Sequence, residues 1–165
     1  MLSKRLIIKN YTSILESFLK EREFVCVCSF MKNFYVFGGY KRVASKSSCF
    51  VFKCSESHWS YIESMNSKRH CAACEFFEGI IVVSGDIDSR TVLRSLEAYD
   101  HHGNRWGRLP DMIETRYRQS LVTSGNKLYA IGGVEEYSWE VFDNKTRKFT
   151  PIRQNLRYLK VIDIF

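Results

Sequence analysis

One template occurs three times in this chain at a fixed distance, and this repetition constrains the fold more than any other feature. The units begin at Phe18, Met65 and Met112, which are 47 residues apart, and each has an arginine four residues further on. These arginines are Arg22, Arg69 and Arg116. A period of this length is typical of an array of like modules. Function is therefore expected on a surface built from loops rather than in one compact active site.

Composition excludes several other classes of protein. The 165 residues are about the length of one domain, and a hydrophobic share of 45% is enough for a core. Net charge is +7, but the basic residues are scattered singly or in pairs, such as Lys41-Arg42, so no nucleic-acid tail is expected. No stretch approaches the ~18 apolar residues of a membrane span, and the apolar stretch near the N-terminus is too short for a signal peptide. The sequence thus predicts a cytoplasmic protein that binds neither nucleic acid nor membrane.

The six cysteines need a separate explanation, and they are Cys26, Cys28, Cys49, Cys54, Cys71 and Cys74. The Cys26/Cys28 and Cys71/Cys74 pairs superficially resemble zinc ligands. Alignment of the repeats gives Cys26 the same position as Ala73, which is an ordinary small or apolar strand position. Free cysteine behaves as a small hydrophobe at such positions. We therefore expect no metal, no other cofactor and no disulfide framework.

Each unit is expected to form four short strands. They are predicted at 24–28, 34–37, 49–52 and 58–62 in the first unit, at 71–74, 80–83, 96–99 and 105–108 in the second, and at 120–122, 128–131, 139–142 and 148–150 in the third. The second strand of each unit is apolar on both faces, which indicates burial on both sides. It ends in a small pair, Gly38-Gly39, Ser84-Gly85 or Gly132-Gly133. Glycine there lets the backbone turn sharply and a neighbouring layer approach.

Aromatic residues recur in the second half of each unit. Those of the third strand are Phe52, Tyr99 and Phe142, and those of the fourth, seven residues later, are Trp59, Trp106 and Phe149. Buried aromatics and strand-end glycines usually serve the fold, so a packing role is expected for Tyr99, Trp59, Trp106 and the glycines. Residues 1–17 do not fit the template, and their apolar spacing suits a short helix. Residues 158–165 resemble the start of a fourth unit.

These units resemble the kelch repeat, especially that of BTB-kelch (kelch-like) proteins. The resemblance is carried by Leu96-Glu97-Ala98-Tyr99-Asp100 with Trp106, by Gly132-Gly133 with Glu140-Val141-Phe142-Asp143, and by the Met-x-x-x-Arg openings. It implies an all-β, partial kelch-type β-propeller with three four-stranded blades and a possible fourth-blade stub. The repeats would span 18–64, 65–111 and 112–157. Blade 1 departs from the pattern because it lacks the glutamate and the aspartate of the third strand.

The resemblance also implies a function. It suggests a non-catalytic protein-binding module that recognises partners or substrates, by likeness to the substrate receptors of cullin-based ubiquitin ligases. Two other hypotheses stay open: an actin-associated kelch protein, and a non-binding remnant of a longer kelch-like gene. Kelch propellers usually have more blades, commonly six. Because two copies of three blades would make six, a head-to-tail homodimer is one expectation.

Partner-binding residues are predicted at one rim of the blades. By resemblance, Arg22, Arg69 and Arg116 lie near that rim, where an arginine suits a bidentate grip on a carboxylate. The alternative is an intra-fold salt bridge or carbonyl contact that holds the connection between blades. The loops after the small pairs carry the other candidates, because recognition usually lies on loops of a rigid scaffold. These candidates are Lys41, Arg42, Asp86, Asp88, Arg90, Glu135, Glu136 and Tyr137.

Catalytic motifs are weak in this sequence. Asp100-x-x-Gly103-x-x-Trp106 faintly resembles the Asp-box of sialidases, but its spacing differs and it occurs once. The four histidines, His58, His70, His101 and His102, form no defensible copper constellation of the kind found in some kelch-fold oxidases. No glycine-rich phosphate loop or nucleophile elbow is present. We therefore expect no catalysis.

Overall fold

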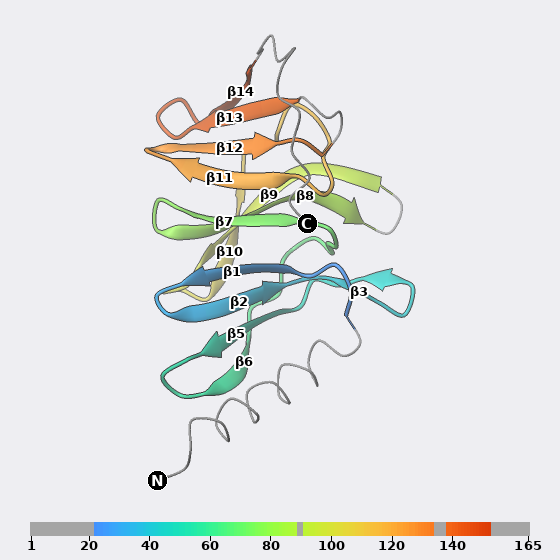
Figure 1. Cartoon of the computed structure of the whole chain (residues 1–165), viewed down its shortest axis with the longest axis vertical. Coiled ribbons are helices and arrows are strands. Elements are labelled where there is room, and N and C mark those ends of the chain that lie inside the picture. Colours follow the sequence, from blue (N-terminus) through green and yellow to red (C-terminus); the bar gives the residue numbers. More distant parts are fainter. Residues whose placement is uncertain (1–21, 89–90, 134–137, 153–165) are drawn as a thin grey trace, which may run out of the picture.

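The chain folds into three four-stranded antiparallel sheets, called blades 1 to 3 in chain order (Figure 1). This architecture comes from a computed structural model that describes residues 22–88, 91–133 and 138–152. The predicted N-terminal helix (1–17) and the predicted fourth-unit stub (158–165) lie outside the described residues. No helix in the described part is long and apolar enough to cross a membrane. The all-β prediction with three four-stranded units is confirmed.

In each blade the four main strands follow one another in chain order. Blade 1 contains β1 (Cys26–Phe30), β2 (Asn33–Phe37), β5 (Cys49–Lys53) and β6 (His58–Ile62). Blade 2 contains β7 (Ala73–Phe77), β8 (Ile80–Asp88), β9 (Thr91–Asp100) and β10 (Arg105–Leu109). Blade 3 contains β11 (Ser120–Ser124), β12 (Lys127–Ile131), β13 (Trp139–Asp143) and β14 (Lys148–Ile152). A small hairpin of β3 (Tyr40–Lys41) and β4 (Ala44–Ser45) follows β2.

Strand register explains the seven-residue spacing of the aromatic pairs. Trp106 lies directly opposite Tyr99 across the β9–β10 hairpin, and their ring centroids are 5.2 Å apart. Phe52 with Trp59, and Phe142 with Phe149, form the same cross-strand pair in blades 1 and 3. Such aromatic pairs stabilise antiparallel strands beyond simple area burial.

The core lies between the blades rather than within one sheet. Along β8, Ile81 and Val83 pack toward blade 1, whereas the intervening Val82 packs toward blade 3. None of the three side chains has exposed surface. This explains why the second strand is apolar on both faces: a middle blade has a neighbour on each side. Strand β7 contacts both β1 and β11, so the first strands of the three blades lie side by side.

The first strands of blades 1 and 2 begin later than the sequence predicts, whereas that of blade 3 begins at Ser120 as predicted. β1 begins at Cys26 and β7 at Ala73, each two residues after the predicted start. The cause is a left-handed residue two positions after each repeat arginine: Phe24 (φ 54°), Cys71 (φ 59°) and Arg118 (φ 56°). A residue with positive φ cannot continue an extended strand. In contrast, β8 and β9 are longer than predicted, because Ile87 pairs with Val92 and extends their hairpin.

Candidate binding surface

Arg69 lies inside blade 2, at the connection that enters it from blade 1. Its Nη1 donates to the carbonyl oxygens of Gly85 (2.7 Å) and Ser95 (3.0 Å), and its Nη2 donates to Ser95 Oγ (2.8 Å). Its Nε and Nη2 also donate to Glu97 Oε1 at 3.3 and 3.1 Å. The side chain of Arg69 has no exposed surface. A buried guanidinium requires this full set of partners.

Arg116 repeats the arrangement in blade 3. It donates to the carbonyl oxygens of Gly132 (2.6 Å) and Ser138 (2.7 Å), to Ser138 Oγ (2.7 Å) and to Glu140 Oε1 (3.0 Å). Its side chain is likewise unexposed. The glutamate of blade 2 or 3 also accepts from two backbone amides of the incoming connection, which in blade 3 are those of Ile113 (2.6 Å) and Glu114 (3.1 Å). This geometry matches the intra-fold alternative, in which each arginine holds the connection between blades.

Blade 1 uses a different partner for its arginine. Arg22 keeps the contacts to Gly38 O (3.0 Å) and Ser48 Oγ (2.8 Å), but Phe50 occupies the position of the glutamate. The guanidinium carbon lies 4.8 Å from the Phe50 ring centroid, which is a cation–π contact. Burial without a carboxylate at that position lowers the pKa of Arg22.

The left-handed residues connect the blades to one another. The amide of Cys71 donates to the carbonyl oxygen of Phe24 at 3.1 Å, and the amide of Arg118 donates to that of Cys71 at 3.1 Å. We call the residues that follow the repeat arginines the inner rim: Phe24, His70, Cys71, Tyr117 and Arg118. Phe24 is 51% exposed and Tyr117 is 39% exposed, and Arg118 is exposed as well.

Sequence reasoning missed the inner rim. The apolar pattern predicts Phe24 and Cys71 as the first residues of strands, whereas the structure gives both a positive φ. The three units also carry different residue types at the rim positions. One available signal was their constant offset from the repeat arginines. His70 is held in place within the rim: its ring lies 5.0 Å from that of Tyr40 and 6.3 Å from that of Phe24, and its Nδ1 is 2.8 Å from Ser45 Oγ.

The β3–β4 hairpin lies beside the inner rim. The amide of Tyr40 donates to the carbonyl oxygen of Glu23 at 2.8 Å, and Glu23 immediately precedes Phe24. Two left-handed residues, Arg42 (φ 50°) and Val43 (φ 58°), form the hairpin tip, as a two-residue turn requires. Figure 1 shows β3 and the far ends of β8 and β9 at the same end of the blades. The structure thus places the base of the hairpin that carries Lys41 and Arg42 beside the inner rim.

The other predicted loop residues lie in β8 or in the segments that follow β8 and β12 in the sequence. Asp86 and Asp88 belong to the extension of β8, and only their backbone is described. Arg90, Glu135, Glu136 and Tyr137 lie outside the described residues.

Most of the glycines that we assigned to packing lie where another part of the chain approaches closely. A Cβ on Gly38 would meet the carbonyl oxygen of Arg69, and one on Gly85 would meet the Gln119 amide. Gly39 and Gly133 are similarly crowded, whereas a Cβ on Gly132 would meet nothing. Tyr99 is buried, and Trp106 donates its indole hydrogen to Glu63 O at 2.8 Å.

The thiols are also part of the packing between blades. The side chains of Cys26, Cys28 and Cys74 lie together in the core between blades 1 and 2. The hydrogen bond with Cys74, followed by burial, raises the pKa of Cys28, so this thiol stays protonated at neutral pH. Within the described residues, no three His, Cys, Asp or Glu side chains form a group that could hold a metal ion.

A known sequence motif covers the first two of these repeats. The kelch motif matches residues 22–66 and 68–113, which together make up more than half of the chain. The chain belongs to the kelch-repeat family. Blade 3 lies outside the matched residues, but it repeats the arginine, serine and glutamate contacts of blade 2. Kelch repeats typically bind proteins and are usually non-catalytic.

Two curated relatives show distant similarity. One is the kelch repeat and BTB domain-containing protein F47D12.7 of Caenorhabditis elegans, which is 24% identical over 74% of this chain and 23% of its own length. The other is Kelch-like protein 41b of Danio rerio, which is 30% identical over 53% of this chain and 14% of its own. The chain therefore spans less than a quarter of the length of these relatives.

The kelch repeats of this chain also resemble a solved kelch-propeller structure. The protein YjhT superposes with a TM-score of 0.72 and 14% identity, over 84% of this chain and 53% of that chain. At this identity the likeness shows the fold alone. It confirms the predicted kelch-propeller architecture and indicates that three blades correspond to about half of that structure.

Proposed function

We propose that this kelch module is a non-catalytic binding protein that recognises a partner protein through the inner rim and the adjacent β3–β4 hairpin. The observation that carries this proposal is the chain of hydrogen bonds from Phe24 to Cys71 and on to Arg118. It fixes the backbone of three successive blades at one edge while their side chains differ. Exposed aromatic and arginine side chains on a rigid scaffold are typical of residues that dominate protein interfaces.

The biological setting that we propose comes from the BTB-kelch resemblance. It is substrate recruitment to a cullin-based ubiquitin ligase in the cytoplasm. An actin-associated role is the second candidate, and co-sedimentation with filamentous actin separates the two. A chain without any binding function would instead capture no partner that depends on inner-rim residues.

The experiment compares partner capture by the full chain and by inner-rim variants. Arg118→Ala removes one positive charge from the rim, and Phe24→Gly removes an exposed ring while suiting the positive φ. Lys148→Ala is the matched control, because it removes one charge from an exposed site near the opposite ends of the strands. We expect both rim variants, but not the control, to lose the same cross-linked partners in quantitative mass spectrometry. Capture of identical partners by all variants would contradict the inner-rim proposal.

We also propose that a second copy of the chain covers the outer faces of blades 1 and 3. Phe34 of blade 1 occupies the same repeat position as Ile81 and Leu128. Those two residues have no exposed surface, whereas Phe34 is 48% exposed. Tyr129 of blade 3 occupies the same repeat position as Val82. Val82 is fully buried, whereas Tyr129 is only half-buried. The two outer faces thus repeat the positions that pack together inside the chain. The match of this chain to half of YjhT supports two copies per ring.

A further inference from the structure

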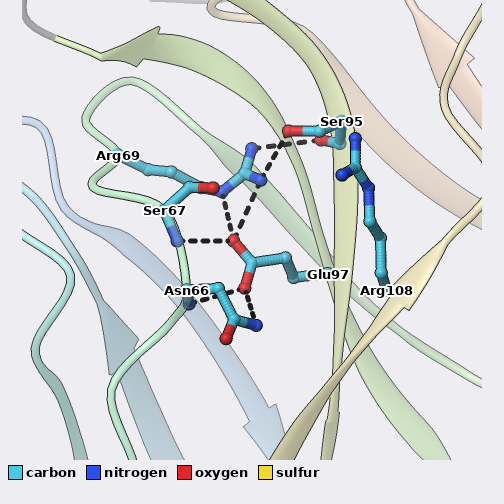
Figure 2. Close-up of a pocket in the computed structure, with 6 residues that line it drawn as sticks. All are labelled: Asn66, Ser67, Arg69, Ser95, Glu97 and Arg108. Carbon is cyan, nitrogen blue, oxygen red and sulfur yellow. Dashed lines mark hydrogen bonds and ion pairs between the residues drawn. The ribbon is translucent and has the colours of Figure 1, made fainter.

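A polar hollow of about 380 Å³ lies in blade 2, beside the connection that enters from blade 1. Its lining residues are Asn66, Ser67, Arg69, Ser95, Glu97 and Arg108. Figure 2 shows Arg69, Ser67 and Asn66 along the incoming connection, with Arg69 reaching toward Ser95 and with Glu97 across from Ser67 and Asn66, while Arg108 lies beside Ser95. Most of these residues have counterparts in blade 3, so the two blades can be compared position by position.

In blade 3, a carboxylate occupies the corresponding place. Glu114 Oε2 lies 3.3 Å from Arg116 Nη2 and accepts a hydrogen bond from Ser138 Oγ at 2.5 Å. The Glu114 side chain is half exposed and therefore reaches this position from the solvent side. Arg116 still contacts it even though the arginine itself has no exposed surface. Blade 3 thus shows that the arginine and serine of a kelch repeat can bind a second carboxylate besides the glutamate of the third strand.

In blade 2, the counterpart of Glu114 is Ser67, which is too short to make these contacts. Ser95 Oγ accepts from Arg69 Nη2 at 2.8 Å, as Ser138 does from Arg116. Within the part of the chain that the structure describes, however, the Ser95 hydroxyl donates to no acceptor. The donors that hold Glu114 in blade 3 are therefore present in blade 2 without a second carboxylate from the described residues.

The electrostatic balance of the hollow favours an anion. The negative charge of Glu97 is compensated, because the carboxylate accepts from Arg69 and from the amides of Asn66 (2.7 Å) and Ser67 (3.0 Å). Arg108 adds a positive charge at the edge of the hollow, and its side chain is 71% exposed. Arg108 is held near Asp111 by a hydrogen bond of 3.2 Å. The residues that line the hollow thus carry two positive charges and one negative charge. Asp111, outside the lining, is shared between Arg108 and Arg94, so the charge around the hollow stays positive.

We propose that the hollow of blade 2 binds a carboxylate from an acidic side chain of the partner protein, at the position that Glu114 fills in blade 3. Ser95 Oγ donates to this carboxylate, Arg69 Nη2 lies behind it, and Arg108 contacts it from the solvent side. A carboxylate suits this site because charge-assisted hydrogen bonds are stronger than neutral ones. This inference rests on the proposed function and names an acidic peptide segment as the class of ligand.

The test titrates the ¹⁵N-labelled full chain with two blocked tripeptides, acetyl-Gly-Glu-Gly-amide and its Gln counterpart. We expect the Glu peptide to shift the Ser95 amide and Arg108 Nε signals in a saturable way, and the Gln peptide to bind at least about tenfold more weakly. Sodium acetate should shift the same signals, whereas equal binding of both peptides would overturn the proposal.

Substitutions locate the binding in the hollow. Ser67→Glu supplies the missing carboxylate from the chain itself and should abolish binding of the Glu peptide. Lys68→Gln changes the net charge by the same amount at an exposed neighbouring position, and should bind the peptide like the unmodified chain. Arg108→Ala, at an exposed site that does not support the fold, should weaken binding at least about tenfold. If Ser67→Glu or Arg108→Ala bound the peptide with unchanged affinity, the proposal would be wrong.

Partner capture separates this proposal from the inner-rim proposal. If Arg118→Ala loses the partner and Ser67→Glu retains it, the hollow proposal fails while the proposed function stands. If the two variants lose the same partner and Lys68→Gln retains it, both proposals are supported. Conversely, Glu114→Ser should open a second hollow in blade 3, and Glu peptide should then shift the Ser138 amide as well.

Discussion

The amide of Cys71 donates to the carbonyl oxygen of Phe24 at 3.1 Å, and this bond crosses the boundary between blades 1 and 2. Arg118 makes the same contact to Cys71 across the next boundary. Because these bonds use only backbone atoms, they hold the inner rim in place whatever side chains it carries. Side chains at these positions are therefore available to determine which partner binds.

Replacement of Arg69 tests its place in the fold. Arg69→Ala leaves the unexposed Glu97 without its charged partner, and breaking a buried pair in this way costs about 3–5 kcal/mol. We expect this loss in the free energy of unfolding, measured with urea. Arg94→Ala, at a side chain that is 58% exposed, should change stability by no more than about 0.5 kcal/mol. Unchanged stability together with weaker partner binding would instead favour the partner-binding role that the sequence left open for Arg69.

Alanine substitutions at two glycines with positive φ distinguish the cost of steric crowding from the cost of backbone strain. Gly85 (φ +64°) faces the Arg116 carbonyl, which lies 2.6 Å from where a Cβ would be, whereas a Cβ on Gly79 (φ +86°) would meet nothing within 4 Å. Gly79→Ala should therefore lower the free energy of unfolding only by the cost of holding alanine at a positive φ, about 1–2 kcal/mol. Gly85→Ala should cost more than that, and thermal unfolding of the two variants would show it. Equal losses would mean that the neighbouring turn moves aside without cost.

His101 should make stability depend on pH below neutrality. Its ring packs edge-on against Phe30 with centroids 4.9 Å apart. Burial, and secondarily the neighbouring His102, lower the pKa of His101 from its ordinary value of 6.5. The unfolded chain then binds more protons than the folded chain as the pH falls below about 6.5, so stability decreases in that range.

A variant without the titrating ring provides the check. His101→Phe keeps an aromatic ring beside Phe30 but cannot bind a proton. We expect its melting temperature to fall less between pH 7 and pH 5 than that of the unmodified chain. His58→Gln is the control and should show the same fall as the unmodified chain. An identical pH dependence in His101→Phe would contradict the role assigned to this histidine.

The strands and blades could be predicted from the sequence because they depend on local spacing. The aromatic residue at Tyr99 and the one seven residues later, Trp106, are opposite each other across a short hairpin, so their spacing fixes the register. The alternation of Ile81, Val82 and Val83 between two interfaces likewise follows from the period of two in a strand.

The candidate site could not be predicted in the same way, because it depends on contacts between distant residues. The partners of Arg69 on Gly85 and Ser95 lie 16 and 26 residues away, and only the folded register brings them within hydrogen-bond distance. The inner rim depends on backbone angles, and Phe24 is not a residue type that usually adopts a positive φ. The hollow of blade 2 depends on Ser67 at the position of Glu114 in blade 3, beside an arginine and a serine that are far apart in the sequence.

The proposed second copy predicts a defined mass in solution. Phe34 and Tyr129 lie at positions that are buried between blades elsewhere in the chain, and repeat modules bury such surfaces by stacking on a neighbour. We expect light scattering to give twice the mass of one chain at micromolar concentration. Phe34→Lys places a charge on the outer face of blade 1 and should shift the protein to the mass of one chain. Val43→Lys, at the 86% exposed hairpin tip, is the control and should leave the dimer intact. A stable monomer of the unmodified chain at this concentration would refute the second copy.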